Sequence, residues 1–236
     1  MGIHKLIPTG NEELDLKLGG GYPFPSLILI EGEHGTGKTA LVYQFIYGAL
    51  TKGLKVLVFT TELTVKEFLY SMKELNLDPI RMFIKGLLRI YSIQMAGIKW
   101  IEKYAALLLP LVGSYISVEE GKYDIAVVDS LTHLGIYATP SSVLNFISKV
   151  RVLVSRGKGV ILTLHPKSLR EDLAIRLRAV CDGYIVLRNE AVGGRLVKLM
   201  NIVKMRGLPP GAETSIIFDI DPAFGIKIIP LKLAKA

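Results

Sequence analysis

The sequence of 236 residues contains a single cysteine, Cys181. One thiol cannot form a disulfide within the chain and has no metal-ligand spacing, so a reducing compartment such as the cytoplasm fits. Long hydrophobic runs are also missing. Residues 104–118 form an apolar segment without charged side chains, but it is shorter than the ~18–20 residues of a membrane-spanning helix and contains Pro110. Residues 1–15 lack the apolar region of a signal peptide. We therefore expect a cytoplasmic protein without a membrane span.

Blocks of like charge are absent, although the formal net charge is +8. A positive surplus favours an acidic partner, such as a nucleotide, a nucleic acid, an anionic membrane face or an acidic protein. Lysines scattered over a soluble protein explain the charge equally well, because no run of five or six like charges occurs. Half of the residues are hydrophobic, which is enough for a sizeable core. Repeats, low-complexity segments and linkers are also lacking, so we expect residues 1–236 to form one domain.

Apolar strand-like segments alternate with amphipathic helix-like segments through most of the chain. Strands are predicted at 26–30, 55–60, 88–93, 124–129 and 159–165, and helices at 39–53, 65–75, 98–116, 141–157 and about 168–178. Thr64 and Glu67 form a predicted capping box, and the helix over 98–116 should break at Pro110. Such alternation indicates an α/β fold with a mainly parallel sheet covered by helices on both faces.

Four strand-like segments joined by turn residues follow near the C terminus, at 183–189, 195–205, 214–221 and 225–230. They predict a C-terminal antiparallel extension on one edge of the sheet. Ligands of parallel sheets bind at the carboxyl ends of the strands, which is where we expect the functional residues.

Residues 32–39, GEHGTGKT, fit the phosphate-binding pattern G-x-x-x-x-G-K-[ST] between a strand and a helix. Lys38 can reach the β- and γ-phosphates and assist catalysis, while the Thr39 hydroxyl is a hard oxygen ligand for Mg²⁺. Amides at the start of the next helix, near Ala40, favour an anion. The alternative is a glycine turn that only caps the helix. The candidate nucleotide-binding residues of this segment are Gly35, Thr36, Gly37, Lys38, Thr39 and Ala40.

Three polar residues follow other predicted strands. Asp129 can hold Mg²⁺ through water, or it can simply cap a turn. Glu62 can orient and deprotonate an attacking water, or it can be a loop glutamate placed near a helix N-terminus. His165 can sense the γ-phosphate and pass its presence to the next loop, or it can be a structural histidine at a strand end.

Lys204 and Arg206 lie on a late strand with both cations on one face. Such a pair can act across a subunit boundary on the γ-phosphate of a neighbour. Two solvated basic residues are the alternative. His34, inside the phosphate loop, is expected to contribute only its backbone.

These segments together resemble the RecA-type ATPases and, more closely, the single-domain relatives of the KaiC clock ATPases, in particular the group that serves the motor of the archaellum (the archaeal flagellum). The resemblance covers nearly the whole chain. Its most specific stretches are TGNEELDLKLGGGYPFPSLILIEGEHGTGKT, TTELTVKEFLYSMKEL, VVDSLTHL, VRVLVSRGKGVILTLHP, GGRLVK, KMRG and FDIDPAFGIKIIPL.

The resemblance implies a cytoplasmic RecA-like P-loop NTPase core that binds ATP and Mg²⁺. It also implies assembly into a ring, for which we expect a hexamer, and docking on the hexameric motor ATPase at the cytoplasmic face of the membrane-bound motor. Proteins of this group are regarded as regulators rather than main force generators. KaiC-type domains carry two adjacent glutamates after the second strand, whereas Leu63 follows Glu62 here. This departure predicts slow or absent hydrolysis.

Two other functions remain open from the residues alone. A RecA-like recombinase paralogue would bind single-stranded DNA with basic residues and stacking aromatics. Residues 130–142 have one aromatic and no Lys or Arg, and residues 166–178 have basic residues but no aromatic, which disfavours nucleic acid. A KaiC-like autokinase would use Ser130 or a threonine near Glu62 as phosphate acceptor, and the sequence does not decide this.

Overall fold

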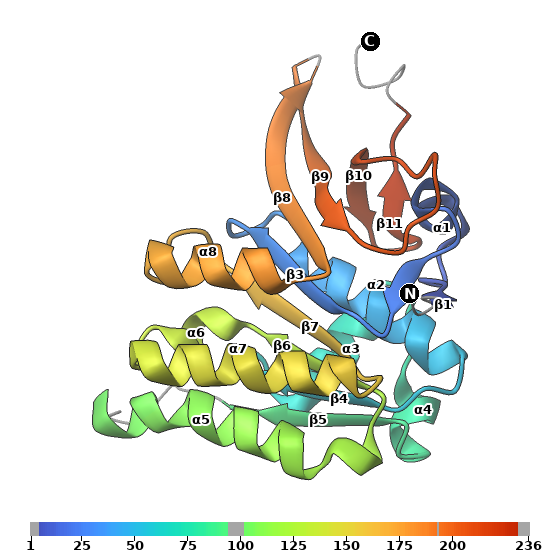
Figure 1. Cartoon of the computed structure of the whole chain (residues 1–236). Helices are drawn as coiled ribbons and strands as arrows, with labels where there is room; N and C mark the ends of the chain where they lie inside the picture. Colours follow the sequence, from blue (N-terminus) through green and yellow to red (C-terminus); the bar gives the residue numbers. More distant parts are fainter. Residues whose placement is uncertain (1–4, 94–101, 193, 231–236) are drawn as a thin grey trace.

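The structure, a computed structural model, describes residues 5–93, 102–192 and 194–230. A nine-stranded sheet with the order β11-β10-β9-β8-β3-β7-β6-β4-β5 organises the molecule (Figure 1). Its parallel strands are β3 (Leu27–Gly32), β4 (Val56–Thr60), β5 (Leu88–Ser92), β6 (Ile125–Asp129), β7 (Gly159–Leu164) and β8 (Gly183–Val192). A separate two-stranded sheet joins β1 (Lys5–Ile7) to β2 (Tyr22–Phe24).

The C-terminal part of the sheet is antiparallel, as predicted. It consists of β9 (Arg195–Met205), β10 (Ser215–Asp221) and β11 (Gly225–Ile228). The predicted extension began one strand too early, because β8 pairs in parallel with β3 and antiparallel only with β9. Helix α8 (Glu171–Val180) returns the chain between β7 and β8, and a helical crossover leads to a parallel strand.

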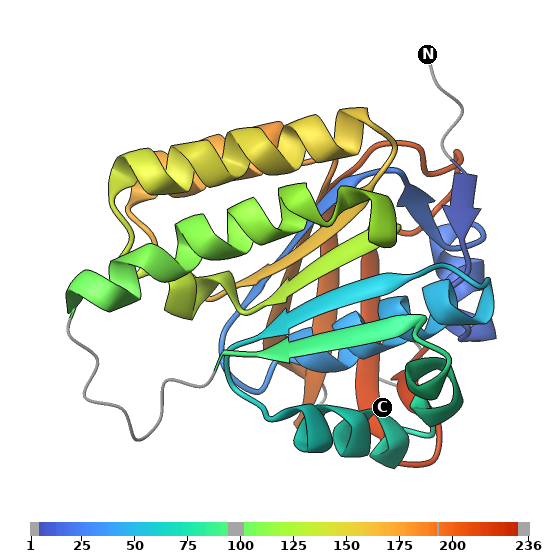
Figure 2. The same ribbon diagram turned by 90° about the horizontal axis from the view of Figure 1, so that it is seen from below.

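Helices cover both faces of the sheet (Figures 1 and 2). One face carries α2 (Lys38–Thr51) and α3 (Val65–Glu74), with α1 (Glu12–Leu18) and α4 (Ile80–Ile84) at its margin. The other face carries α5 (Glu102–Val118), α6 (Leu131–Gly135), α7 (Pro140–Ser155) and α8; a 3₁₀ turn, Glu120–Lys122, follows α5. The predicted α/β fold with helices on both faces is confirmed.

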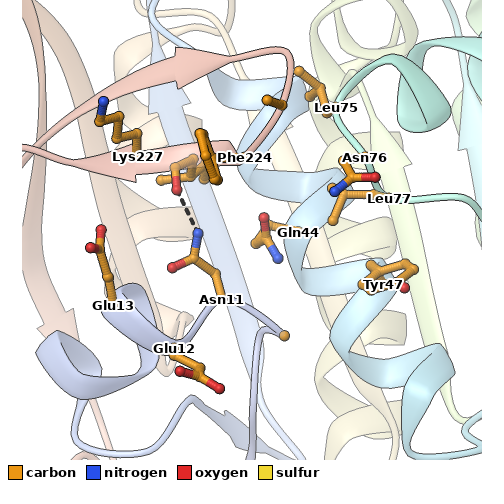
Figure 3. Close-up of a pocket in the computed structure, with 13 residues that line it drawn as sticks. Asn11, Glu12, Glu13, Gln44, Tyr47, Leu75, Asn76, Leu77, Phe224 and Lys227 are labelled. Atoms are coloured by element: carbon orange, nitrogen blue, oxygen red, sulfur yellow. Dashed lines mark hydrogen bonds between the residues drawn. The ribbon is translucent and has the colours of Figure 1, made fainter.

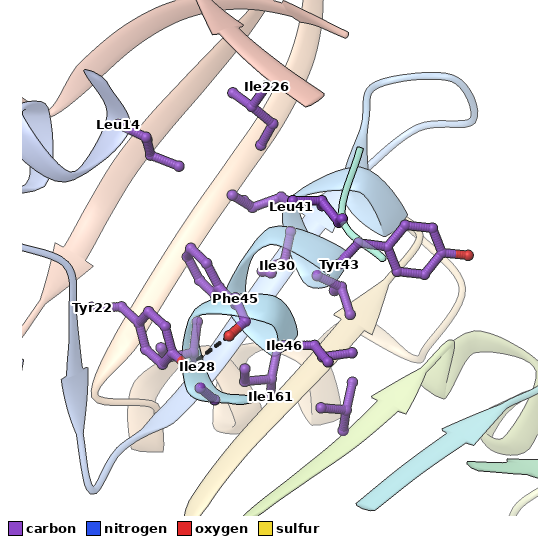
Figure 4. Close-up of a cluster of buried hydrophobic side chains, with 14 of the residues drawn as sticks. Leu14, Tyr22, Ile28, Ile30, Leu41, Tyr43, Phe45, Ile46, Ile161 and Ile226 are labelled. Carbon is purple, nitrogen blue, oxygen red and sulfur yellow. Dashed lines mark hydrogen bonds between the residues drawn. The ribbon is translucent and has the colours of Figure 1, made fainter. Parts of the chain in front are cut away.

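The central strand β3 is buried on both of its faces. Ile28 and Ile30 pack with Leu41 and Phe45 of α2 in one core cluster (Figure 4), whereas Leu27 and Leu29 belong to the cluster beneath α5 and α7. Alternate side chains of a strand point to opposite faces, so a strand between two helical layers reads as a continuous apolar run. This burial fixes the end of β3, from which the phosphate loop projects.

The predicted break at Pro110 is wrong, because α5 runs without interruption from Glu102 to Val118. Proline removes one backbone hydrogen bond from a helix interior, but Leu109 and Val112 beside it are fully or almost fully buried against the second core cluster. Packing of this face therefore holds the helix together. The first part of the predicted helix, residues 98–101, lies outside the described residues. The capping box of Thr64 and Glu67 is present at the start of α3.

Elements β1, β2, α1, α4 and α6 were not predicted from the sequence. Within the described residues, no helix combines the length and the apolar character needed to cross a membrane.

Candidate nucleotide-binding site

The loop between β3 and α2 has the backbone geometry that its glycines allow. Gly37 precedes α2 with a φ of 95°, a left-handed conformation that side chains disfavour. A Cβ on Gly32 would lie 2.6 Å from the Thr36 Oγ1 and 2.7 Å from the carbonyl oxygen of Leu187. The Thr36 hydroxyl donates to the carbonyl of Glu33 at 2.8 Å, closing the loop on itself. The first amides of α2 thus face the space beyond the end of β3.

Lys38, the first residue of α2, directs its ammonium group into this loop. Its Nζ donates to the carbonyl oxygens of Gly32 at 2.7 Å and Glu33 at 2.8 Å. Burial lowers the pKa of Lys38, while the carboxylates of Asp129, Glu62 and Glu33 act to raise it. The ammonium group of Lys38 is therefore a buried cation whose hydrogen-bond partners, two carbonyl oxygens, carry no full negative charge. A phosphate oxygen in the same place would pair with it more strongly.

A pocket of about 250 Å³ opens in front of the loop. It lies at the carboxyl ends of β3, β4, β6 and β7, where the sequence predicted it. Almost all of the residues predicted from these strand ends and from the loop meet here; Thr36 lies behind them in the loop. The lining residues are His34, Gly35, Gly37, Lys38, Thr39, Ala40, Glu62, Asp129, His165 and Ile220.

Asp129 and Thr39 place a carboxylate and a hydroxyl on one side of the pocket. Asp129 is buried at the end of β6, and its Oδ1 accepts a hydrogen bond from the Thr163 hydroxyl at 2.6 Å. Burial raises the pKa of Asp129, against the hydrogen bonds from Thr163 and Thr39 and the charge of Lys38. A hydroxyl and a carboxylate facing one phosphate site are the donor set that Mg²⁺ prefers. The residues present therefore fit this ion. The peptide bond between Asp129 and Ser130 is cis, which no pattern in the sequence indicated.

Glu62 lies after the end of β4 and pairs with a residue that the sequence analysis did not single out. Its Oε1 is 3.4 Å from the Nε2 of His133, in α6, and both side chains are about half exposed. The hydrogen bond to His133 lowers the pKa of Glu62, and the same contact raises the pKa of His133. Glu62 is therefore ionised at the open side of the pocket, as an acceptor of protons must be.

His165 ends β7 in contact with the phosphate loop. Its ring packs against that of His34, with centroids 3.9 Å apart and the ring planes tilted by 38°. His34 therefore adds a side-chain contact to the backbone contribution that was predicted for it. The backbone N–H of His165 donates to the Thr132 hydroxyl at 2.8 Å. Burial lowers the pKa of His165, and the nearby Lys38 and His34 lower it further. A neutral imidazole beside the loop can donate one hydrogen bond to a terminal phosphate.

Lys204 and Arg206 do not join this pocket. Lys204 lies near the end of β9, where its Nζ donates to the carbonyl of Ala179 at 3.0 Å, and an Arg206 nitrogen is 3.5 Å from Asp182. The strand pairing places Lys204 next to the start of β8, at the opposite end of β3 from the phosphate loop. This differs from the expectation that all motifs lie at the carboxyl ends of the parallel strands. Strand β9 is also internal, between β8 and β10, rather than at the sheet edge.

A larger hollow of about 580 Å³ lies further along α2 (Figure 3). Gln44, Tyr47 and Phe224 line it together with the loop after α3 and the start of α1. Gln44 is buried, its Nε2 donates to the Thr9 carbonyl at 2.9 Å, and its Oε1 has no hydrogen-bond partner. Helix α2 and the β10–β11 hairpin contribute residues to both hollows. The residues suited to bind a phosphate, Lys38, Thr39 and Asp129, line the smaller pocket and not the larger hollow.

Comparison with known proteins identifies the family. The family "ATPase: KaiC" matches residues 7–233. The archaeal flagellar ATP-binding protein FlaH of Sulfolobus acidocaldarius is 40% identical over 231 residues, covering 98% of this chain and 100% of that protein. FlaH of Methanocaldococcus jannaschii is 30% identical, covering 97% of each chain.

A solved structure agrees with these relatives. The crystal structure of the flagellar accessory protein FlaH from Methanocaldococcus jannaschii matches with a TM-score of 0.83 and 28% sequence identity, over 97% of this chain and 99% of that chain. The predicted resemblance is confirmed. The chain belongs to the KaiC-type ATPase family and, within it, to the FlaH group of archaeal flagellar proteins.

Proposed function

We propose that this chain binds ATP with Mg²⁺ in the smaller pocket and acts as a nucleotide-dependent regulator of an archaellum motor. The observation that carries the proposal is the convergence of Lys38, Thr39 and Asp129 on one phosphate-sized space at the start of α2. The names of the FlaH relatives supply the motor context. Thr39 and Asp129 would hold the Mg²⁺, which neutralises charge on the phosphate oxygens when bound.

The nucleoside end of ATP requires space beyond the smaller pocket. Ligand pockets for small molecules span about 300–1,000 Å³, so a pocket of about 250 Å³ accommodates the phosphates rather than a whole nucleotide. The choice of ATP as the nucleotide follows the FlaH relatives, which are named ATP-binding proteins.

Slow hydrolysis is the second part of the proposal. Glu62 is the carboxylate at the open side of the pocket, where it can accept a proton from an attacking water. It has Leu63 rather than a second glutamate beside it, and it is engaged with His133. Both features support a protein in which ATP binding matters more for function than ATP turnover.

Assembly into a ring is the third part. The Arg206 side chain is 62% exposed, so a neighbouring subunit can reach it. Lys204 and Arg206 lie at the opposite end of β3 from the phosphate loop of their own chain, so a phosphate contact requires the pocket of another copy. A closed ring repeats one such heterologous contact. ATP then favours the ring through its higher affinity for the assembled state.

The test of the regulatory function is capture of the motor ATPase from a native lysate by the tagged chain, with ATP, with ADP and without nucleotide. ATP should increase capture, because the ring that docks on the motor at the cytoplasmic face of the membrane forms with ATP. If the tagged chain captures no motor ATPase under any of the three nucleotide conditions, the motor role is refuted. The same preparations, titrated with labelled single-stranded DNA, test the recombinase alternative, for which binding should weaken steeply with salt.

A further inference from the structure

Histidine is rare in this chain, with four residues, yet three of them gather around the candidate nucleotide pocket. His34 and His165 line it and pack their rings against one another. His133 does not line it, but its Nε2 reaches the Glu62 Oε1 at 3.4 Å. The proposed hydrolysis leaves this third histidine without a role, although it touches the residue on which water activation depends.

Helix α6 holds His133 firmly in place. The N–H of Thr132 donates to the Ser130 hydroxyl at 3.1 Å, which caps the helix directly after Asp129. The Thr132 hydroxyl accepts the N–H of His165 at 2.8 Å, which ties α6 to the end of β7. His133 is therefore anchored to two strand ends of the pocket, while Glu62 follows a third, that of β4.

We propose that His133 is a positioning residue that restrains Glu62, holding its carboxylate in an ion pair at the pocket rim and limiting ATP hydrolysis. This inference rests on the proposed ATP-binding function. In the restrained reaction, a water oxygen bonds to the γ-phosphorus while the bond to the bridging oxygen breaks. ADP leaves with that electron pair, and Glu62 takes the proton of the water.

The chemistry explains why this pairing slows the reaction. The strength of a general base falls with its pKa, and the hydrogen bond from His133 lowers the pKa of Glu62. The pair also occupies Oε1, one of the two carboxylate oxygens that a water could use. The other charged or titratable groups facing Glu62 are His165 at the end of β7, Lys38 in the loop and Asp129 at the end of β6. None of these is bonded to it.

The sign of the pH dependence follows from the contact. Glu62 raises the pKa of His133, so the ion pair is complete below that raised pKa and is lost as the pH rises through it. The restraint of Glu62 by His133 therefore weakens as the pH rises, in a range above the ordinary imidazole pKa of about 6.5. Turnover of the wild type should increase over that range more steeply than turnover of a variant without the imidazole. Lys38 and His165 are present in both proteins and contribute equally to both pH profiles. The difference between the two profiles therefore reports the titration of His133.

The experiment compares wild type with His133→Ala and His133→Gln in ATP turnover across pH and in ATP binding by thermal shift. The free energy of a half-exposed ion pair of this kind converts to a change in rate of about two- to five-fold. His133→Ala should therefore hydrolyse ATP faster than wild type by that factor, while binding ATP equally well. His133→Gln keeps a hydrogen-bond donor but cannot be protonated. Its rate of ATP turnover should lie between those of wild type and His133→Ala, and that rate should depend less on pH. Arg156→Ala removes a surface ion pair with Glu120 beyond the far end of α7 and should match wild type.

Titration of His133 by NMR provides a readout that needs no nucleotide. Its imidazole signal is the one missing from His133→Gln, and its pKa should fall in Glu62→Gln. An unchanged His133 pKa in Glu62→Gln, or turnover of His133→Ala equal to or below that of wild type, would overturn the restraint. Absence of ATP binding in wild type would instead refute the proposed function. A raised His133 pKa that responds to Glu62 would still support the pair in that event.

Discussion

Replacement of Lys38 by alanine tests the nucleotide site most directly. Lys38 is 8% exposed, and its ammonium group donates hydrogen bonds to the loop carbonyls of Gly32 and Glu33. A hydrogen bond to a charged group contributes about 1.5–3 kcal/mol. If Lys38 makes one such bond to a phosphate, Lys38→Ala should raise the Kd for Mg-ATP by about ten- to 150-fold.

Thermal unfolding converts this loss into a measurable shift. Mg-ATP at 100 times the wild-type Kd stabilises the fold by about 2.7 kcal/mol. At the same concentration the variant should gain only about 0.3–1.3 kcal/mol. For a chain of this size each kcal/mol raises the Tm by about 2–4 °C. The ATP-dependent shift should therefore fall from about 5–11 °C to about 1–5 °C.

The protein without nucleotide should tolerate Lys38→Ala. The substitution removes two hydrogen bonds, but it also removes a buried cation, and water from the open pocket can reach the freed carbonyls. Lys52→Ala is the matched control, because Lys52 is an exposed lysine that caps the other end of α2. An undiminished ATP shift in a folded Lys38→Ala protein would refute the assignment of the loop.

Two further outcomes are expected. Glu62→Gln should keep the ATP-dependent Tm shift and abolish phosphate release, which in wild type should stay well below the ~10 s⁻¹ of a typical enzyme; equal release in both proteins would exclude Glu62 as the base. Replacing Lys204 and Arg206 together by alanine should weaken ATP-dependent assembly in light scattering, with ATP binding by the monomer retained.

Much of the pocket was predictable because its parts carry local or strand-end signals. The loop pattern fixes a strand, a turn and a helix within one short segment, so Lys38 and Thr39 needed no tertiary information. Glu62, Asp129 and His165 each follow an apolar run, and parallel strands bring such residues to one edge. The order of the strands was not needed for this prediction, since all of them point the same way.

The contact on which the proposed restraint rests was not predictable in the same way. His133 lies in α6, a helix of five residues without periodicity, and its partner Glu62 is far away in the sequence. The direction of β8 depends on whether the chain crosses over through α8, which strand-like composition alone does not reveal. Pro110 carries a strong local signal for a break, and burial of the neighbouring side chains overrides it.

The charge of the pocket gives a second reason for assembly, beside the positions of Lys204 and Arg206 in the fold. Among the described residues that line it, Lys38 is the one permanent cation, and the carboxylates of Glu62 and Asp129 oppose it. A triphosphate carries several negative charges, so one lysine cannot balance both the ligand and the two carboxylates. Mg²⁺ between Thr39 and Asp129 would offset part of the deficit. Backbone N–H groups at the start of α2 would offset a further part, and an exposed Arg206 on a neighbouring copy would add a cation without any rearrangement of the parallel sheet.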